Sequence, residues 1–227
     1  MDWRHAIETC GFATLPGLFS SDYLDHLLKE IEVLSPKQTR AGLRHALRLG
    51  PVARITRDPR LAEPACSVLG KNAFPFRATL FDKSVTANWL VVWHQDTALP
   101  LRERIELAGW GPWSVKEGVH YAHAPAGPLS QVLALRIHFD DSTPDNGPLR
   151  VLPGTHKLGV LSDDDVHELA EGSAPIDCCV PKGGVLGMRP LLVHASSKSR
   201  VDLPRRVLHI EYAASDSIAA PLQLTVC

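Results

Sequence analysis

The chain has 227 residues, of which 44% are hydrophobic and 22% are charged, and its mean hydropathy is −0.04. These values are those of an ordinary globular protein and exclude disordered, collagen-like and fibrous classes. The 24 basic and 25 acidic residues give a formal net charge of −1, which provides no electrostatic basis for binding nucleic acid or an acidic membrane surface.

Cysteine usage and the chain ends indicate the cellular compartment. No run of 18 apolar residues is present, so no membrane span is expected. Residues 1–5 lack the basic-then-apolar pattern of a signal peptide. The five cysteines are an odd number without a CxxC motif, which makes a poor disulfide framework. We therefore expect a cytoplasmic protein, whose oligomeric state the sequence does not predict.

The first part of the chain, residues 1–72, is predicted to be a mostly helical cover. Ser20 or Ser21 is a suitable N-cap for the first helix, whose apolar residues recur at helical spacing. Gly70 is a suitable end for the last one. The helical patterns occur at residues 21–34, 39–49 and 59–69, after a short predicted strand at 11–16.

From residue 73 onward, short apolar runs alternate with Gly, Pro, Asp and Asn, as in antiparallel strands. We therefore expect a single domain over residues 1–227, mainly β, with a jelly-roll core at 73–227 behind the helical cover. The stretch 97–130 is long for a loop in a compact domain and is predicted to be a functional, lid-like insertion. The expected strands are 77–81, 89–94, 132–140, 149–152, 185–194 and 206–212.

The most informative polar motif is His94-Gln95-Asp96, at the end of a predicted strand. Residues i and i+2 of a strand point to the same face, so this imidazole and carboxylate can meet at one ion. With a histidine from a neighbouring strand they would make the facial triad of non-heme Fe(II) sites. The spacing alone is not specific, so the downstream residues must decide. Two other segments have similar spacing: His138-Phe139-Asp140 and His209-Ile210-Glu211.

Downstream residues favour the first pair. His194 ends the apolar run 185–193, and a polar loop leads to a returning strand with Arg205. We expect a hairpin that puts this arginine on the strand beside His194. A guanidinium holds a carboxylate through two parallel hydrogen bonds, so this set suits an Fe(II) site that uses 2-oxoglutarate. His138 is then a strand residue lining the barrel or a satisfied interior histidine.

Several segments together resemble the phytanoyl-CoA dioxygenase family of Fe(II)/2-oxoglutarate-dependent oxygenases. Segments 88–96 and 145–156 resemble motifs of that family, and 194–197 followed by 204–206 resembles its last site motif. The entry segment 11–13 is also similar, so the resemblance covers nearly the whole chain. Three motifs in the family's order are more specific than any one of them.

The resemblance implies a double-stranded β-helix, a cupin-like jelly roll, with Fe(II) held by His94, Asp96 and His194. It also implies 2-oxoglutarate as cosubstrate, with O2 and a small-molecule substrate. Arg205, eleven residues after the distal histidine, matches the family's carboxylate-binding arginine. The adjacent Arg206 is the alternative, because a slip of one residue changes the strand face.

Two more positions match the family near the cosubstrate. Ser196 matches a hydroxyl that assists cosubstrate binding, and Arg136 falls where the family places a residue near the cosubstrate. Because the family often has an aromatic residue there, Arg136 is also a candidate for reading a polar or anionic substrate. Ala195 stands where the family commonly has glycine. The presence of Asp96 favours hydroxylation or a related oxidation over halogenation.

The resemblance therefore predicts hydroxylation of an unactivated C–H bond in a small organic substrate, with release of succinate and CO2. Trp113, His120 and Tyr121, within the 97–130 stretch, are candidate substrate contacts. One alternative is a cupin-like metal-dependent isomerase or hydrolase on the same barrel. The other is a non-catalytic binding module that keeps the barrel.

Overall fold

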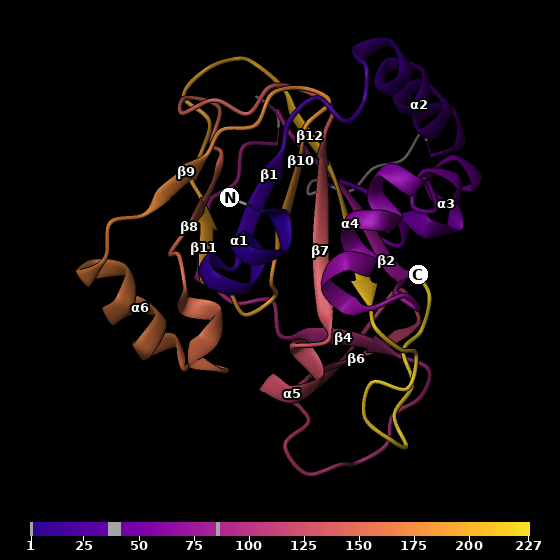
Figure 1. The fold of residues 1–227 in the computed structure, drawn as a ribbon, viewed down its shortest axis with the longest axis vertical. Helices are drawn as coiled ribbons and strands as arrows, with labels where there is room; N and C mark the ends of the chain where they lie inside the picture. The colour runs from indigo at the N-terminus through magenta and orange to yellow at the C-terminus, as the bar shows by residue number, and fades with distance from the viewer. Residues whose placement is uncertain (1, 36–41, 85–86) are drawn as a thin grey trace.

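The computed structural model describes residues 2–35, 42–84 and 87–227. Within these ranges the strands form a five-stranded, a four-stranded and a three-stranded antiparallel sheet (Figure 1). The two larger sheets face each other, and helices of the N-terminal third cover the outer side of the five-stranded sheet. This is the expected double-stranded β-helix behind a helical cover.

Helices α1 to α4 precede β2, so the first part of the chain is mostly helical, as the sequence predicted. Ser20 caps α2, since its hydroxyl accepts a hydrogen bond from the Tyr23 amide, and Gly70 follows the last residue of α4. No helix in the described part of the chain is long and apolar enough to cross a membrane. The helices are α1 (Trp3–Cys10), α2 (Ser21–Leu34), α3 (Gly50–Ile55), α4 (Pro59–Leu69), α5 (Ala126–Leu129) and α6 (Asp163–Gly172), with 3-10 turns η1 (Ala46–Arg48) and η2 (Thr155–Leu158).

Two details of the helical cover differ from expectation. The sequence did not predict α1. The helix expected at 39–49 is wrong where it can be compared: residues 42–49 contain only η1, and residues 39–41 lie outside the described ranges. His45 has φ 53° and ψ 37°, a left-handed conformation through which a right-handed helix does not continue.

The five-stranded sheet supplies one wall of the barrel. Because side chains alternate between faces, Leu80, Leu135 and Leu208 pack under the helices against residues such as Leu24 and Ile55, while their neighbours face the barrel interior. The order is β1 (Phe12–Leu15), β10 (Val185–Met188), β7 (Val132–His138), β12 (Arg205–Ala213) and β2 (Phe74–Lys83).

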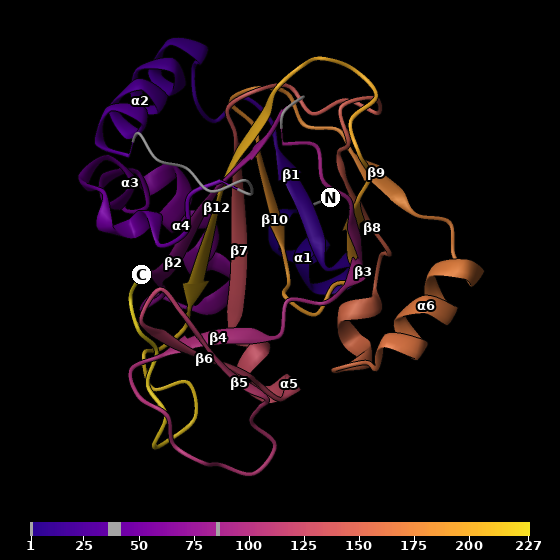
Figure 2. The ribbon, with the colours of Figure 1, turned by 180° about the vertical axis from the view of Figure 1, so that it is seen from behind.

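The four-stranded sheet supplies the opposite wall. Val166 of α6 packs with Leu152 and Val193 beside this sheet, so α6 lies on the side away from the helical cover (Figure 2). The order is β3 (Val91–His94), β11 (His194–Ser196), β8 (Leu149–Val151) and β9 (Ile176–Cys178).

The chain changes sheets between β10 and β11, which corrects two expectations. The strand expected at 185–194 is two strands, separated by a turn in which the Leu192 amide donates to the Arg189 carbonyl. Pro190 in that turn has no amide proton to continue a ladder. The expected hairpin is also wrong, because β11 pairs with β3 and β8, whereas β12 pairs with β2 and β7.

The 97–130 stretch, which was predicted to be a long lid-like loop, is partly regular structure, whereas residues 102–112 are irregular. The stretch contains β4 (Ala98–Leu101), β5 (Trp113–Lys116) and β6 (Val119–His123), which make the three-stranded sheet β4-β6-β5, followed by α5. Leu99 and Ala122 of this sheet pack with Phe76 and Val132 of the main sheet. The stretch is therefore attached to the lower end of the barrel through a hydrophobic cluster (Figure 2).

Candidate metal centre

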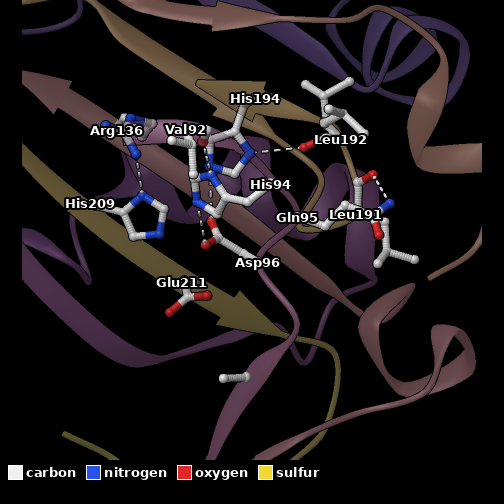
Figure 3. A network of polar contacts seen from close by, with 12 residues as sticks. Val92, His94, Gln95, Asp96, Arg136, Leu191, Leu192, His194, His209 and Glu211 are labelled. Atoms are coloured by element: carbon white, nitrogen blue, oxygen red, sulfur yellow. Dashed lines mark hydrogen bonds and ion pairs between the residues drawn. The ribbon is translucent and has the colours of Figure 1, made fainter. Parts of the chain in front are cut away.

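The side chains of His94, Asp96 and His194 meet inside the barrel (Figure 3). Their potential ligand atoms all lie within 4.8 Å of one another. The Asp96 carboxylate oxygens lie 3.7 Å from His94 Nε2 and 3.5 Å from His194 Nε2. Because β3 and β11 are neighbours and their register aligns His94 with His194, residues far apart in the sequence share one site.

Each imidazole is oriented by the backbone carbonyl two residues before it in the chain. His94 Nδ1 lies 2.8 Å from the Val92 carbonyl oxygen, and His194 Nδ1 lies 2.8 Å from the Leu192 carbonyl oxygen. A carbonyl oxygen only accepts hydrogen bonds, so Nδ1 carries the proton in each ring. The lone pair therefore lies on Nε2, the nitrogen that faces Asp96, and this is the arrangement found in metal-binding histidines.

The protonation states also suit a metal. Burial lowers the pKa of His194 to about 4, so its ring is neutral near pH 7. Burial opposes ionisation of Asp96, but the surrounding imidazoles and the Arg77 guanidinium hold the pKa of its carboxyl below the usual range. Neutral imidazoles and an ionised carboxylate are the metal-binding forms. Two nitrogens and one oxygen on one side fit the facial set of a non-heme Fe(II) centre.

Gln95 lies between His94, the last residue of β3, and Asp96, and it fixes the segment that carries both. Its amide nitrogen donates to the carbonyls of Gly159 (2.9 Å) and Leu191 (2.8 Å), and its oxygen accepts from the Leu161 amide. The Asp96 amide donates to the Pro190 carbonyl at 2.9 Å. These contacts hold the end of β3 against the turn that precedes His194, which preserves the spacing of the triad.

A cavity of about 260 Å³ extends from the triad along the inner face of the five-stranded sheet. Its volume and its mixture of aromatic and charged walls are those of a small-molecule site. All three residues expected near the cosubstrate line it: Arg136, Ser196 and Arg205. Trp113, His120 and Tyr121 do not, since they belong to the three-stranded sheet.

The inner face of the main sheet is unusually polar and is organised in rows across β2, β12 and β7. Alternate residues of each strand point inward, so inward side chains at paired positions lie beside each other. The register aligns Arg77 with Glu211, Thr79 with His209, His209 with Arg136, and Lys83 with Arg205.

A cationic cluster occupies the end of this face at Arg205. Arg205 Nη2 lies 3.3 Å from Ser196 Oγ, and Lys83 Nζ lies 2.8 Å from the same oxygen and 2.7 Å from the Ser197 carbonyl. Arg205 is 4% exposed and Lys83 is 1% exposed. Among the described residues neither forms an ion pair with a carboxylate. Two buried like charges without a counter-ion are unfavourable, so this cluster is suited to an anionic ligand.

The geometry separates the two arginines that the sequence left open. Arg205 lines the cavity, whereas Arg206 points to the other face of β12 and makes a bidentate pair with Asp140 at 2.7 and 2.8 Å. Sequence reasoning missed Lys83. The available signal was the strand pattern itself, because Lys83 is in phase with Arg77, whose side chain lines the cavity.

Two further residues named from the sequence lie apart from the triad. Tyr121 is buried, and its hydroxyl lies 2.9 Å from His45 Nε2, so it has a structural partner. His138 is an interior residue, but it is not satisfied as expected: neither ring nitrogen has a hydrogen-bond partner among the described residues. Burial lowers the pKa of His138 to about 3, so its ring is neutral.

Removal of one partner of the buried Arg77–Glu211 pair is expected to destabilise the cavity wall. Arg77 Nη2 lies 2.6 Å from Glu211 Oε1, Arg77 Nε contacts the second oxygen, and the Glu211 side chain is only 2% exposed. Glu211→Ala leaves a buried guanidinium unpaired, so the free energy of unfolding should fall by about 3–5 kcal/mol. Urea denaturation measures this, with Glu30→Ala, at an exposed ion pair with Arg54, as the control. Equal stability of the two variants would show that the buried pair contributes no more than a surface pair.

Comparison with known proteins places this geometry in a family. The chain is 24% identical over 172 residues to the ectoine dioxygenase of Bordetella bronchiseptica, an alignment that covers 69% of this chain and 49% of that protein. The chain thus spans about half the length of the curated relatives that it matches first.

Solved structures show the same fold. The crystal structure of EctD from S. alaskensis with bound Fe matches with a TM-score of 0.70 at 21% identity, covering 92% of this chain and 75% of that one. That of AviO1 from Streptomyces viridochromogenes matches with a TM-score of 0.66 at 22% identity, covering 93% and 95%. The profile of the family described as phytanoyl-CoA dioxygenase (PhyH) matches residues 7–207. Since this match spans most of the chain, the protein belongs to the phytanoyl-CoA dioxygenase (PhyH) family of Fe(II)/2-oxoglutarate oxygenases.

Proposed function

We propose that this protein is an Fe(II)- and 2-oxoglutarate-dependent dioxygenase that hydroxylates an unactivated C–H bond of a small organic substrate. The observation that carries the proposal is that one cavity joins the two-imidazole, one-carboxylate triad to the buried guanidinium of Arg205 and the hydroxyl of Ser196. A metal site beside a carboxylate site matches the two ends of a 2-oxo dicarboxylic acid.

Oxidation of 2-oxoglutarate supplies the electrons that balance the proposed reaction. Substrate R–H, 2-oxoglutarate and O2 give R–OH, succinate and CO2, so that one oxygen atom enters the substrate and the other enters succinate. Two of the four electrons needed to reduce O2 come from the decarboxylation and two come from the C–H bond. When bound, Fe(II) supplies the O2 chemistry, and the protein supplies binding, orientation and exclusion of water.

The side chains divide this work. His94, Asp96 and His194 are the proposed ligands of Fe(II), each presenting one donor atom to the same point. Arg205 and Ser196 are the proposed partners of the distal carboxylate of 2-oxoglutarate. The single proton of the Ser196 hydroxyl goes to the Gly147 carbonyl at 2.9 Å, and it would turn to the carboxylate when 2-oxoglutarate binds. The Lys83 side chain donates a hydrogen bond to the same hydroxyl and adds positive charge to the site.

Anaerobic titration tests the proposal without knowledge of the substrate. The Fe(II)-loaded protein is titrated with 2-oxoglutarate, and the weak visible charge-transfer absorption of the chelate is followed. We expect a saturable band in the wild type and none in Asp96→Ala. Added O2 should then yield succinate, measured by chromatography, which neither an isomerase nor a hydrolase would produce. Absence of both the band and succinate would reject the assignment.

Cosubstrate affinity is expected to depend on pH through Lys83. Burial and the neighbouring Arg205 charge lower the pKa of Lys83 to about 7. Below that pH the ammonium form attracts a dianion, and above it the charge is lost, so the affinity for 2-oxoglutarate should fall as pH rises. We expect a decrease of about tenfold between about pH 6.5 and 8.5. Isothermal titration calorimetry on protein saturated with Ni(II), which supports no turnover, measures it.

Two features identify Lys83 as the group whose titration changes the affinity for 2-oxoglutarate with pH. The pKa of Arg205 is lowered by burial only to about 10, and that of His138 is lowered by burial to about 3, so neither changes charge in this range. Lys83→Met should bind 2-oxoglutarate more weakly at low pH and with a flat profile. A variant profile parallel to that of the wild type would assign the titration to another group.

A further inference from the structure

Arg136 is a guanidinium in the barrel wall without an anionic partner among the described residues. It is 7% exposed and lines the cavity. Its Nη1 lies 2.8 Å from His209 Nδ1, and its guanidinium carbon lies 5.5 Å from the centroid of the Phe81 ring. Its buried Nε has no hydrogen-bond partner in the part of the chain that the structure describes. Burying a cation is costly unless it is paired, so this position is unfavourable in the free protein.

The hydrogen bond between Arg136 and His209 determines which of their atoms can donate to a ligand. A guanidinium has no acceptor, so Arg136 donates to His209 Nδ1, and the single ring proton of His209 lies on Nε2. His209 also lines the cavity. The two side chains lie side by side next to the triad, as Figure 3 shows, and together they present only hydrogen-bond donors. Such a surface is complementary to an oxyanion.

The charges of the proposed complex leave Arg136 unmatched. This step rests on the proposed function. Two positive charges of Fe(II) are matched by Asp96 and by the carboxylate of 2-oxoglutarate next to its keto group. The distal carboxylate matches Arg205, and Glu211 matches Arg77. Both carboxylates of the cosubstrate are thereby used, and among the described residues the positive charge of Arg136, like that of protonated Lys83 beside Arg205, has no counterpart.

The rest of the cavity wall adds positive charge. Arg44 is exposed and belongs to the same lining, where its guanidinium would attract an approaching anion. Asp96 is the acidic side chain that lines the cavity, and it belongs to the proposed metal site. The wall therefore favours an anion over a neutral or cationic substrate.

We propose that the substrate is a small organic acid, and that Arg136, with the Nε2–H of His209, binds its carboxylate beside the metal triad. Binding there gives the guanidinium its missing counter-ion. The carboxylate then fixes the acid by one end, so that a C–H bond farther along its carbon chain faces the metal. Arg136 thus selects the substrate class, while Arg205 holds the cosubstrate.

The test compares acids with their amides, which have similar shape and no charge. Protein loaded with Ni(II) and saturated with 2-oxoglutarate is titrated calorimetrically with three pairs: benzoate and benzamide, phenylacetate and phenylacetamide, hexanoate and hexanamide. We expect at least one acid to bind the wild type about tenfold more tightly than its amide. Arg136→Gln should remove this preference, and Arg136→Lys, which keeps the charge, should retain part of it.

The matched control is Arg206→Gln, an arginine on the opposite face of β12 that lies outside the cavity. It should keep the preference of the wild type. Equal binding of acids and amides to the wild type, or a preference that survives in Arg136→Gln, would overturn the inference. So would a weakened affinity of Arg136→Gln for 2-oxoglutarate with the preference intact, because Arg136 would then serve the cosubstrate. If the wild type fails to bind 2-oxoglutarate at all, the proposed function itself fails.

Discussion

Asp96→Ala is expected to abolish Fe(II)-dependent consumption of 2-oxoglutarate. Asp96 is the anionic member of the triad, and its two oxygens face the Nε2 atoms of His94 and His194. Loss of a residue that merely orients a metal ligand costs about 10- to 100-fold in metal affinity or activity, so loss of the carboxylate itself should exceed that range. Succinate formation and the iron content of the purified protein, determined by mass spectrometry, measure the effect.

Asp177→Ala is the matched control, because Asp177 is a half-exposed aspartate whose partner Arg150 lies outside the cavity. It should bind iron and consume 2-oxoglutarate as the wild type does. Undiminished turnover in a His94→Ala/Asp96→Ala double variant would mean that the metal lies elsewhere, and the proposed function would lose its basis. A loss of iron together with a loss of turnover is the outcome that the geometry predicts.

The triad was predictable because its spacing obeys a local rule. Side chains two apart on a strand share a face, and this rule predicted that His94 and Asp96 meet, although in the structure Asp96 lies just beyond the end of β3. His194 could be named only through the order of the motifs, since its pairing with His94 is a contact between distant parts of the chain. For the same reason, the hairpin predicted between His194 and Arg205 was wrong. The run 185–194 is largely apolar and was read as one strand, although Arg189-Pro190 in its middle marks the point where the chain changes sheets.

Sequence reasoning missed other features for the same reason, because they depend on contacts between distant parts of the chain. The phase of Lys83 with Arg77 indicates the inner face of the strand, but only the tertiary structure shows that Lys83 is buried there against Ser196 and Ser197. The 97–130 stretch carries the turn residues of a loop, yet its short strands pair with one another and pack on the barrel. Propensity alone does not reveal such packing.

Arg205→Ala is expected to raise the KM for 2-oxoglutarate by about 100-fold, roughly 3 kcal/mol, because it removes one partner of a buried charge pair. The kcat at saturating 2-oxoglutarate should change much less, since the metal ligands are untouched. Arg205→Lys should recover only part of the affinity, because an ammonium cannot form the parallel pair of hydrogen bonds. Initial rates of succinate formation against 2-oxoglutarate concentration give both constants.

Arg206→Ala, one residue along the same strand, is the matched control and should leave the KM unchanged, because its side chain pairs with Asp140 outside the cavity. The opposite result would transfer the role to Arg206.

The stability of an Arg205 variant offers a second readout, which separates a role in binding from a structural role. Arg205 has buried Lys83 beside it, and Arg136 also lowers its pKa, so Arg205→Met should relieve repulsion and leave the ligand-free protein at least as stable as the wild type. Thermal unfolding should then show a stabilisation by 2-oxoglutarate in the wild type that the variant lacks. A residue whose removal spares the fold and eliminates the ligand's effect is one that serves binding.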